Sequence, residues 1–274
     1  MLNIIYQDSD VLVINKPAGV IVHGDGKTTE KTLCDFIVEE FPELQDIGEP
    51  MIINRGPSKE PTVLSRPGIV HRLDKETSGV MLIAKTQEAF NILKSQFQNH
   101  TIEKTYNTFV WGLVKEDEGV IDRPIGRSKN DFRKWSAQRF ARGEMRMAIT
   151  AYKVLKRFEG DPVMGRGNIM VGKGNSKIPL AFSFVEVYPK TGRTHQIRVH
   201  FKAINNPIVG DGLYAENHPL ALGFTRLALH ARKIRVILPR DVINKDNSED
   251  VLTGTVSEFE AGLPRDFQNV CELL

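Results

Sequence analysis

The sequence predicts an α+β fold built on a mixed or largely antiparallel β-sheet. Short segments with β-type alternation recur along the 274 residues, and helical periodicity is confined to a few segments. The two kinds of segment do not alternate in the regular order of a parallel sheet. With 41% hydrophobic residues the chain is long enough to bury a sizeable core, and we expect one domain over residues 1–274.

The N-terminal part of the chain is expected to form a hairpin, a helix and a long loop. Residues 3–15 read as two β-type segments joined by a polar turn. Apolar residues recur at helical spacing over residues 30–41, where Thr28 or Thr29 is available as the helix cap. Residues 42–68 contain five prolines and three glycines, which predicts a loop or insertion.

The middle of the chain is dominated by predicted strands. Residues 80–84 form an apolar run short enough for a buried strand, and Thr86 can cap the helix that follows. Alternation predicts strands over residues 105–111 and 182–188, and residues 149–158 also have a β-type pattern.

The C-terminal part is expected to contain a second loop, a helix and two closing strands. Residues 159–180 hold five glycines and two prolines with few large side chains, so we expect a loop. A helix is predicted from His195 to about Ile204, and Pro207 follows its end. Strands are expected over residues 227–238 and 251–256.

Charge is unevenly distributed, although the net charge is only +3. Residues 122–160 hold 11 Lys or Arg against 4 Asp or Glu, residues 188–240 hold 9 against 2, and residues 241–274 hold 2 against 8. Within the first block, Phe132 and Trp135 lie among the cations, a composition typical of surfaces where aromatic rings stack on bases and cations hold phosphates. The alternative is a mobile basic loop with two anchoring aromatic residues. Many soluble enzymes have comparable blocks, so charge alone only suggests a polyanion-facing surface.

Several classes of protein and site are disfavoured. No apolar run approaches the roughly 18–20 residues of a membrane span, and the N-terminus lacks the features of a signal peptide. Cys34 and Cys271 are far apart, which favours reduced thiols over a disulfide or metal site. His195 and His200 are five residues apart and do not share a helix face at ligand spacing. We therefore expect a cytoplasmic protein without a metal or a membrane partner.

The chain is organised around residues 69–80, where an apolar strand end leads into a polar turn, Gly79 and a second apolar strand. Asp74 lies among cations in this turn. An acid at the end of a strand can be held rigidly while staying open to a substrate. Taken alone, the segment also fits an ordinary charged turn at the surface.

Three segments together resemble the signature motifs of the RluA-type RNA pseudouridine synthases. They are His71–Gly79 (HRLDKETSG), Glu103–Tyr106 (EKTY) and Thr191–His200 (TGRTHQIRVH). Further matches are Asn15–Gly19, Pro207–Tyr214, Leu227–Ala231 and Leu263–Phe267. The likeness runs in the same order from about residue 5 to 267, interrupted by the loops at 42–68 and 159–180. This length and order make the match specific.

The resemblance implies an enzyme that isomerises chosen uridines in RNA to pseudouridine without a cofactor, metal or energy source. It also implies a catalytic domain with a bent, mixed and largely antiparallel sheet, flanked by helices and loops and crossed by an active-site cleft. Many relatives carry an N-terminal RNA-binding head, which we expect this chain to lack because its first strand begins almost at Met1. The target could be ribosomal RNA, transfer RNA or both, and we expect a monomer.

The motif matches imply three catalytic residues. Asp74 would stabilise or attack the sugar carbon as the bond between ribose and uracil breaks. Two alternatives stay open: Asp74 bonds covalently to the sugar, or it removes a ribose proton to give a glycal. Arg198 would pair with Asp74, orient it and hold it charged under bound RNA, although an Arg in this position can also pair with a surface acid. Tyr106 would stack on the freed uracil or relay a proton, with a core tyrosine as the alternative.

Four further residues are candidates for RNA contacts. The uridine must be flipped out of its stack to be reached, and Arg72 matches the family's arginine that fills the vacated space. His71 would touch phosphate or merely pack. Arg193 competes with Arg198 for the place beside Asp74 and otherwise would meet phosphate or backbone, and His195 is a candidate for RNA binding.

Two other functions remain as alternatives. One is a non-catalytic RNA-binding protein that keeps the synthase fold, which does not explain why Asp74, Tyr106 and Arg198 are all present. The other is a hydrolase acting on nucleosides with one carboxylate and water, which the basic blocks and the lack of a second motif-placed acid disfavour.

Overall fold

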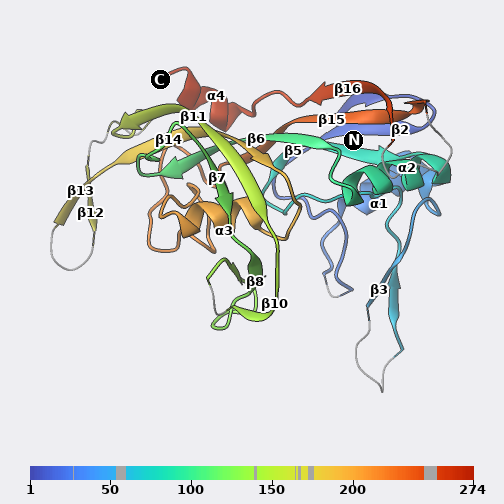
Figure 1. Cartoon of the computed structure of the whole chain (residues 1–274), viewed down its shortest axis with the longest axis horizontal. Coiled ribbons are helices and arrows are strands. Elements are labelled where there is room, and N and C mark those ends of the chain that lie inside the picture. Colours follow the sequence, from blue (N-terminus) through green and yellow to red (C-terminus); the bar gives the residue numbers. More distant parts are fainter. Residues whose placement is uncertain are drawn as a thin grey trace. The chain divides into compact units, whose positions relative to one another are not determined.

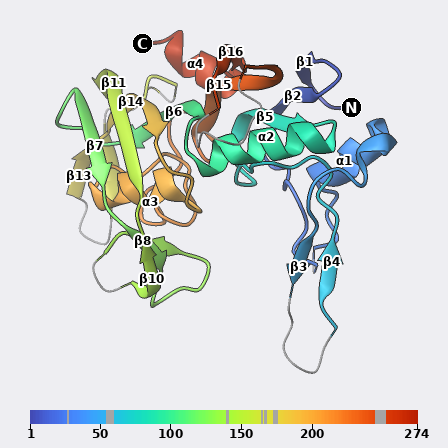
Figure 2. The ribbon, with the colours of Figure 1, turned by 45° about the vertical axis from the view of Figure 1, so that its right-hand side comes forward.

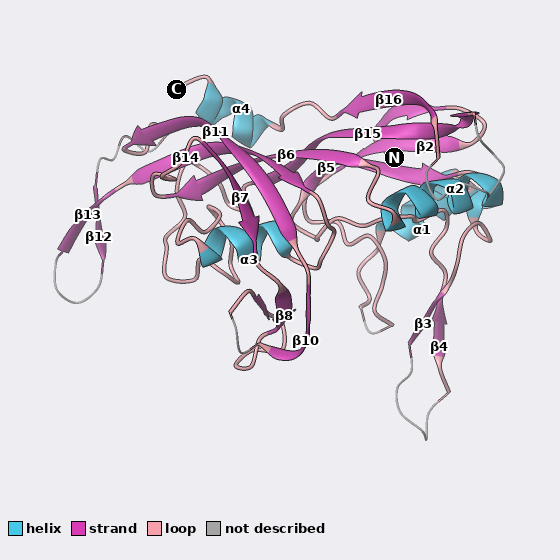
Figure 3. Cartoon of the chain, viewed as in Figure 1, coloured by secondary structure: helices cyan, strands magenta, loops and turns pink. Residues whose placement is uncertain are grey.

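The computed structural model describes residues 1–274 except 27, 54–59, 139–140, 164, 166–167, 172–175 and 244–251. It confirms the predicted fold class, because its strands form a largely antiparallel sheet accompanied by helices (Figures 1 and 3). The chain divides into two compact units. The first unit comprises residues 1–103 and 231–262, and the second comprises residues 104–230 and 263–274. Within the described ranges, no helix is long and apolar enough to cross a membrane.

The first unit contains a sheet covered by helices. Its strands follow the order β1-β2-β5-β15, with β16 also paired to β15. All seven residues of β5 are buried, and α2 packs on this strand through Ala89, Phe90 and Leu93. The bounds are β1 Ile4–Gln7, β2 Val11–Lys16, β5 Ser78–Ala84, β15 Leu229–Val242, β16 Gly254–Glu260, α1 Leu33–Glu40 and α2 Gln87–Gln98.

The helix predicted over residues 30–41 is present, but its cap was assigned to the wrong residue. Helix α1 begins after Thr32, whose hydroxyl accepts from the Asp35 N–H while the Asp35 carboxylate accepts from the Thr32 N–H. This reciprocal pair satisfies two N–H groups that the first helical turn leaves without partners, and neither Thr28 nor Thr29 has an acid placed to do so. The cap predicted at Thr86 is confirmed, because its side chain accepts from the Ala89 N–H.

Both segments predicted as loops contain a short pair of antiparallel strands. The described part of residues 42–68 contains the 3-10 helix η1 (Pro42–Leu44) and the antiparallel pair β3 (Met51–Ile53) and β4 (Thr62–Leu64), which projects as an arm (Figure 2). Residues 159–180 include the pair β12 (Asn168–Val171) and β13 (Ser176–Pro179). Strands of three or four residues are too short for an alternation signal to exceed that of their Pro- and Gly-rich surroundings.

The second unit is built on four strands in the order β6-β14-β11-β7. Helix α3 packs against β11 and β14 (Figure 1). The phenylalanines at the centre of its core are at most 1% exposed: Phe109, Phe182, Phe201, Phe224 and Phe267. The bounds are β6 Glu103–Trp111, β7 Glu118–Asp122, β11 Ile149–Glu159, β14 Ala181–Pro189, α3 Gln196–Ala203 and α4 Arg265–Cys271.

The basic stretch at residues 122–146 carries a small sheet of its own, with the strand order β10-β8-β9. The guanidinium of Arg127 lies 4.4 Å from the ring centroid of Trp135, while Phe132 is 84% exposed. One aromatic residue of the pair therefore packs and the other faces solvent. The bounds are β8 Ile125–Arg127, β9 Trp135–Ser136 and β10 Arg142–Arg146.

Candidate active site

Asp74 lies at the start of a tight turn that leads into β5. The Thr77 N–H donates to the Asp74 carbonyl at 3.1 Å, and the Gly19 N–H donates to the Lys75 carbonyl at 2.8 Å. Thr77 is buried, whereas the Asp74 side chain is half-buried. The backbone is thus fixed on both sides of a carboxylate that keeps part of its surface exposed.

A buried lysine supports this turn from inside the first unit. The side chain of Lys16 is 0% exposed, and its Nζ donates to the carbonyls of Pro17, Val20 and Lys75 at 2.8, 2.8 and 3.1 Å. Hydrogen bonds to a charged donor are stronger than neutral ones, so Lys16 fixes the turn next to Asp74. In the sequence, Lys16 was marked only as part of the Asn15–Gly19 match, and no role was assigned to it.

Gly79 is required where the turn enters β5. Its φ is +122°, and an added Cβ would lie 2.1 Å from the Ala231 carbonyl oxygen. No other residue fits so close an approach of two strands.

His71 is held inside the first unit. Its Nε2 accepts from the Leu82 N–H at 2.9 Å, and its ring stacks on Phe97 with 4.5 Å between centroids. Of the two alternatives given for His71, these contacts support packing. A contact between His71 and RNA stays a prediction.

Arg72 is exposed and is positioned by a neutral histidine. Its Nη1 lies 3.0 Å from Nε2 of His23, whose Nδ1 lies 3.0 Å from the Gly24 carbonyl. Burial, and then the charges of Arg72 and Arg66, lower the pKa of His23, so the ring stays neutral and can accept from Arg72. Sequence reasoning assigned no role to His23 or Arg66.

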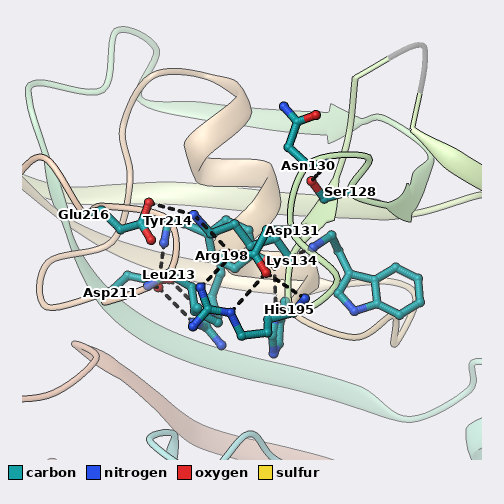
Figure 4. Close-up of polar contacts among 12 residues, drawn as sticks. Ser128, Asn130, Asp131, Lys134, His195, Arg198, Asp211, Leu213, Tyr214 and Glu216 are labelled. Carbon is teal, nitrogen blue, oxygen red and sulfur yellow. Dashed lines mark hydrogen bonds and ion pairs between the residues drawn. The ribbon is translucent and has the colours of Figure 1, made fainter.

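In the second unit, Arg198 is bound by an acid that sequence reasoning missed. Its Nε and Nη2 donate to Oδ2 and Oδ1 of Asp211, each at 2.8 Å (Figure 4). Asp211 has a fully buried side chain and also accepts from the N–H groups of Leu213 and Tyr214. The pair uses two of the five guanidinium N–H groups and fixes the plane of the guanidinium.

A tyrosine connects Arg198 to the basic stretch. The Tyr214 hydroxyl accepts from the Trp135 N–H at 2.9 Å and is hydrogen-bonded to Nδ1 of His195 at 2.9 Å (Figure 4). The Arg198 guanidinium lies 5.1 Å from the Tyr214 ring centroid. Residues Arg198, Asp211, Tyr214, His195 and Trp135 therefore form one connected set, which we call the Arg198 network.

The turn before α3 positions two of the predicted RNA contacts. His195 has a φ of +55° and directly precedes α3, and its carbonyl accepts from the Val199 N–H. Arg193 donates from Nε to the Met147 carbonyl at 3.0 Å. Both side chains are half-buried, and their contacts with RNA stay predictions.

Tyr106 lies in β6 opposite Val187 of β14 and packs against the phenylalanine-rich core. The predicted site residues are thus divided between the units: His71, Arg72 and Asp74 belong to the first, and Tyr106, Arg193, His195 and Arg198 to the second.

Among the described residues, no cluster of three or more His, Cys, Asp or Glu is arranged to hold a metal.

Residues 10–203 match the family described as RNA pseudouridylate synthase. That span contains Asp74, Tyr106 and Arg198 together with the whole basic stretch at residues 122–146. The chain belongs to the RluA-type RNA pseudouridine synthase family.

Curated relatives are similar over the whole chain. An RNA pseudouridine synthase of Bacillus subtilis is 35% identical over 273 residues, which cover 100% of this chain and 73% of that protein. The ribosomal large subunit pseudouridine synthase D of Neisseria meningitidis is 34% identical over 283 residues, covering 100% of this chain and 61% of the relative. For an RNA pseudouridine synthase of Aquifex aeolicus, the identity is 40%, and 78% of this chain and 56% of the relative are covered. The chain thus spans about three fifths of several relatives.

Solved structures support the fold. The human RNA pseudouridylate synthase domain containing 4 superposes with a TM-score of 0.62 at 24% identity, covering 99% of this chain and 92% of that chain. The human domain containing 1 gives a TM-score of 0.60 at 24% identity, covering 100% and 94%.

Proposed function

We propose that this protein isomerises uridine to pseudouridine in RNA, with large-subunit ribosomal RNA as its substrate. The observation that carries the proposal is the family match over residues 10–203, which includes Asp74, Tyr106 and Arg198 in the family's order. The choice of RNA is supported by relatives named ribosomal large subunit pseudouridine synthase D. Transfer RNA is the second substrate class to test.

Asp74 is the proposed catalytic carboxylate. Breaking the bond between ribose and uracil develops positive charge on the sugar, which a carboxylate can stabilise or attack. The turn that holds Asp74 fixes its backbone, which supports a preorganised role.

Arg198 is the proposed partner of Asp74. A carboxylate enclosed by RNA loses its hydration and needs a fixed cation to stay charged. Asp211 already orients the guanidinium through its Nε–Nη2 edge, which supports a role for the remaining N–H groups in binding Asp74.

The remaining residues handle the base and the RNA chain. Tyr106 is proposed to stack on the freed uracil and to relay a proton from the ring carbon. Arg72 is proposed to fill the space vacated by the flipped uridine. His71, Arg193 and His195 are proposed to support RNA binding around these groups.

The proposal extends to the organisation of the protein: both units act together as one catalytic domain in a cytoplasmic monomer. Cooperative unfolding in a single transition would support one domain. The mass in solution, measured by light scattering, would test whether the protein is a monomer.

Mapping of pseudouridines tests the function directly. Total RNA from cells with and without the protein is compared, and purified protein is then incubated with unmodified large-subunit ribosomal RNA and with transfer RNA. We expect one or a few sites to disappear without the protein and to be restored by it in vitro. RNA binding without any conversion would instead favour a non-catalytic RNA-binding protein.

A further inference from the structure

Lys104 lies next to Tyr106 on the same face of β6. Side chains two residues apart in a strand point the same way and are separated by about 7 Å. Tyr106 is opposite Val187, and continuing this antiparallel pairing places Pro189 opposite Lys104. Lys190, the next residue, is therefore at the same end of the strand pair.

Lys104 is half-buried, and no residue in the described ranges provides it with a counter-ion. Among the residues that the structure describes, no carboxylate pairs with its ammonium and no group accepts a hydrogen bond from it. Other lysines of the second unit do have partners: Lys134 pairs with Glu216 at 2.6 Å, and Lys153 pairs with Glu118 at 3.0 Å. An ammonium partly removed from water without a partner is unfavourable, so its presence at this position needs a reason.

The surroundings of Lys104 add positive charge. Burial, and then the charge of Lys190, lower the pKa of Lys104 from 10.5 to about 8. The group therefore remains mostly protonated at neutral pH. An anion bound between the two lysines would supply the missing hydrogen-bond acceptor and remove their mutual repulsion.

We propose that Lys104, with Lys190 beside it, binds a backbone phosphate of the RNA adjacent to the target uridine. This inference rests on the proposed function, in which Tyr106 stacks on the uracil of that uridine. Since the backbone positions of Lys104 and Tyr106 are about 7 Å apart along the strand, the ammonium lies within reach of the nucleotide whose base is stacked. The phosphate would fix the position of the nucleotide along the RNA, while Tyr106 holds its base.

A titration of the lysine side chains tests the phosphate site without requiring turnover. Protein labelled with 13C at the lysine ε-carbons is titrated by NMR alone, with uridine, with uridine 5′-monophosphate and with uridine 3′-monophosphate. Lys104→Met assigns the Lys104 signal, and Lys115, whose side chain is 92% exposed, is the internal control.

Either monophosphate should raise the pKa of Lys104 from about 8 toward 10.5, whereas uridine alone should not. The Lys115 signal should respond to neither monophosphate. A Lys104 pKa that is unchanged by both monophosphates, up to their solubility limits, would overturn the inference.

RNA binding gives a second, independent readout. Because Lys104→Met takes away one phosphate-binding cation, the slope of log affinity against log salt should fall by about 0.7, as one fewer counter-ion is released from single-stranded RNA. Lys104→Arg should keep the slope, and so should Lys115→Met as the matched control. A merely structural Lys104 would leave the slope unchanged while lowering thermal stability.

The two proposals can fail separately. A response of Lys104 to the monophosphates with no pseudouridine formed would remove the proposed function and keep the phosphate site. Pseudouridine formation by Lys104→Met with wild-type KM and an unchanged salt slope would remove the phosphate site and keep the function.

Discussion

The guanidinium of Arg198 and the carboxylate of Asp211 form a buried two-point pair in the second unit, with both N–O distances 2.8 Å. The pair fixes the plane of the guanidinium before any substrate binds. Since Asp211 also binds the backbone at Leu213 and Tyr214, it anchors Arg198 to a loop and not merely to its own helix.

Asp211→Asn should lower kcat on the order of 100-fold, because a loosened guanidinium no longer orients the catalytic carboxylate. It should also reduce the free energy of unfolding by about 3 kcal/mol, because the Arg198 charge stays buried without its counter-charge. Single-turnover kinetics and urea unfolding measure the two effects.

Asp266→Asn is the matched control. Asp266 binds Nε and Nη2 of Arg226 at 2.7 and 3.0 Å in the same unit but has no proposed part in the reaction. The Asp266→Asn variant should have a lower free energy of unfolding and an unchanged kcat. Equal losses of kcat in the two variants would show that Asp211 acts only through stability.

Asp74→Asn should abolish pseudouridine formation while RNA affinity largely survives, because the amide can neither attack the sugar carbon nor balance its positive charge. Conversion is measured by pseudouridine mapping and affinity by filter binding. Glu76→Gln, two residues along the same turn, should remain active. Near-normal conversion by Asp74→Asn would remove Asp74 from its assigned role.

Arg198→Lys should be nearly as severe in kcat as loss of the guanidinium, because an ammonium cannot bind Asp211 at two points and hold a second carboxylate as well. The pair with Asp211 makes this expectation stronger than the sequence alone allowed. The readout is kcat at saturating RNA, with circular dichroism confirming the fold. A variant retaining more than about a third of the wild-type kcat would contradict the role.

Local patterns in the sequence were sufficient for most of the fold. The alternation from Tyr106 onward and the apolar run at Val80–Ala84 are properties of the strands themselves, and both strands are present. Helix α3 was predicted to within one residue at each end. Helix α4 was missed because its seven residues are stabilised mainly by burying Phe267 and Val270 in a core formed by distant segments.

The parts of the site that depend on distant residues could not be predicted. Asp211 follows Arg198 by 13 residues through an irregular loop, so no periodicity links them. Lys16 is fully buried although lysine is ordinarily exposed, and only the three carbonyls around it explain this position. In both cases the motif match marked the segment without indicating what the side chain contacts.

Gly79→Ala should destabilise the protein by more than about 2 kcal/mol, because the new Cβ meets the Ala231 carbonyl and the backbone must keep a positive φ. Urea unfolding measures the loss. Gly262→Ala, where an added Cβ meets nothing within 4 Å, should change stability by less than about 0.5 kcal/mol. Equal stability of the two variants would show that β5 and β15 can separate at this point without cost.

Phe132→Ala tests whether the basic stretch at residues 122–146 contacts RNA. Phe132 is 84% exposed, so its removal costs little packing, whereas loss of stacking on an unpaired base should weaken RNA binding by about 1–3 kcal/mol. Thermal stability should remain unchanged, which separates binding from folding. Val120→Ala, at another exposed apolar position of the second unit (65% exposed), should leave affinity unaffected. Phe132→Trp should retain affinity because it keeps a stacking ring. If Phe132→Ala and Val120→Ala lost affinity equally, the effect would instead come from general surface hydrophobicity.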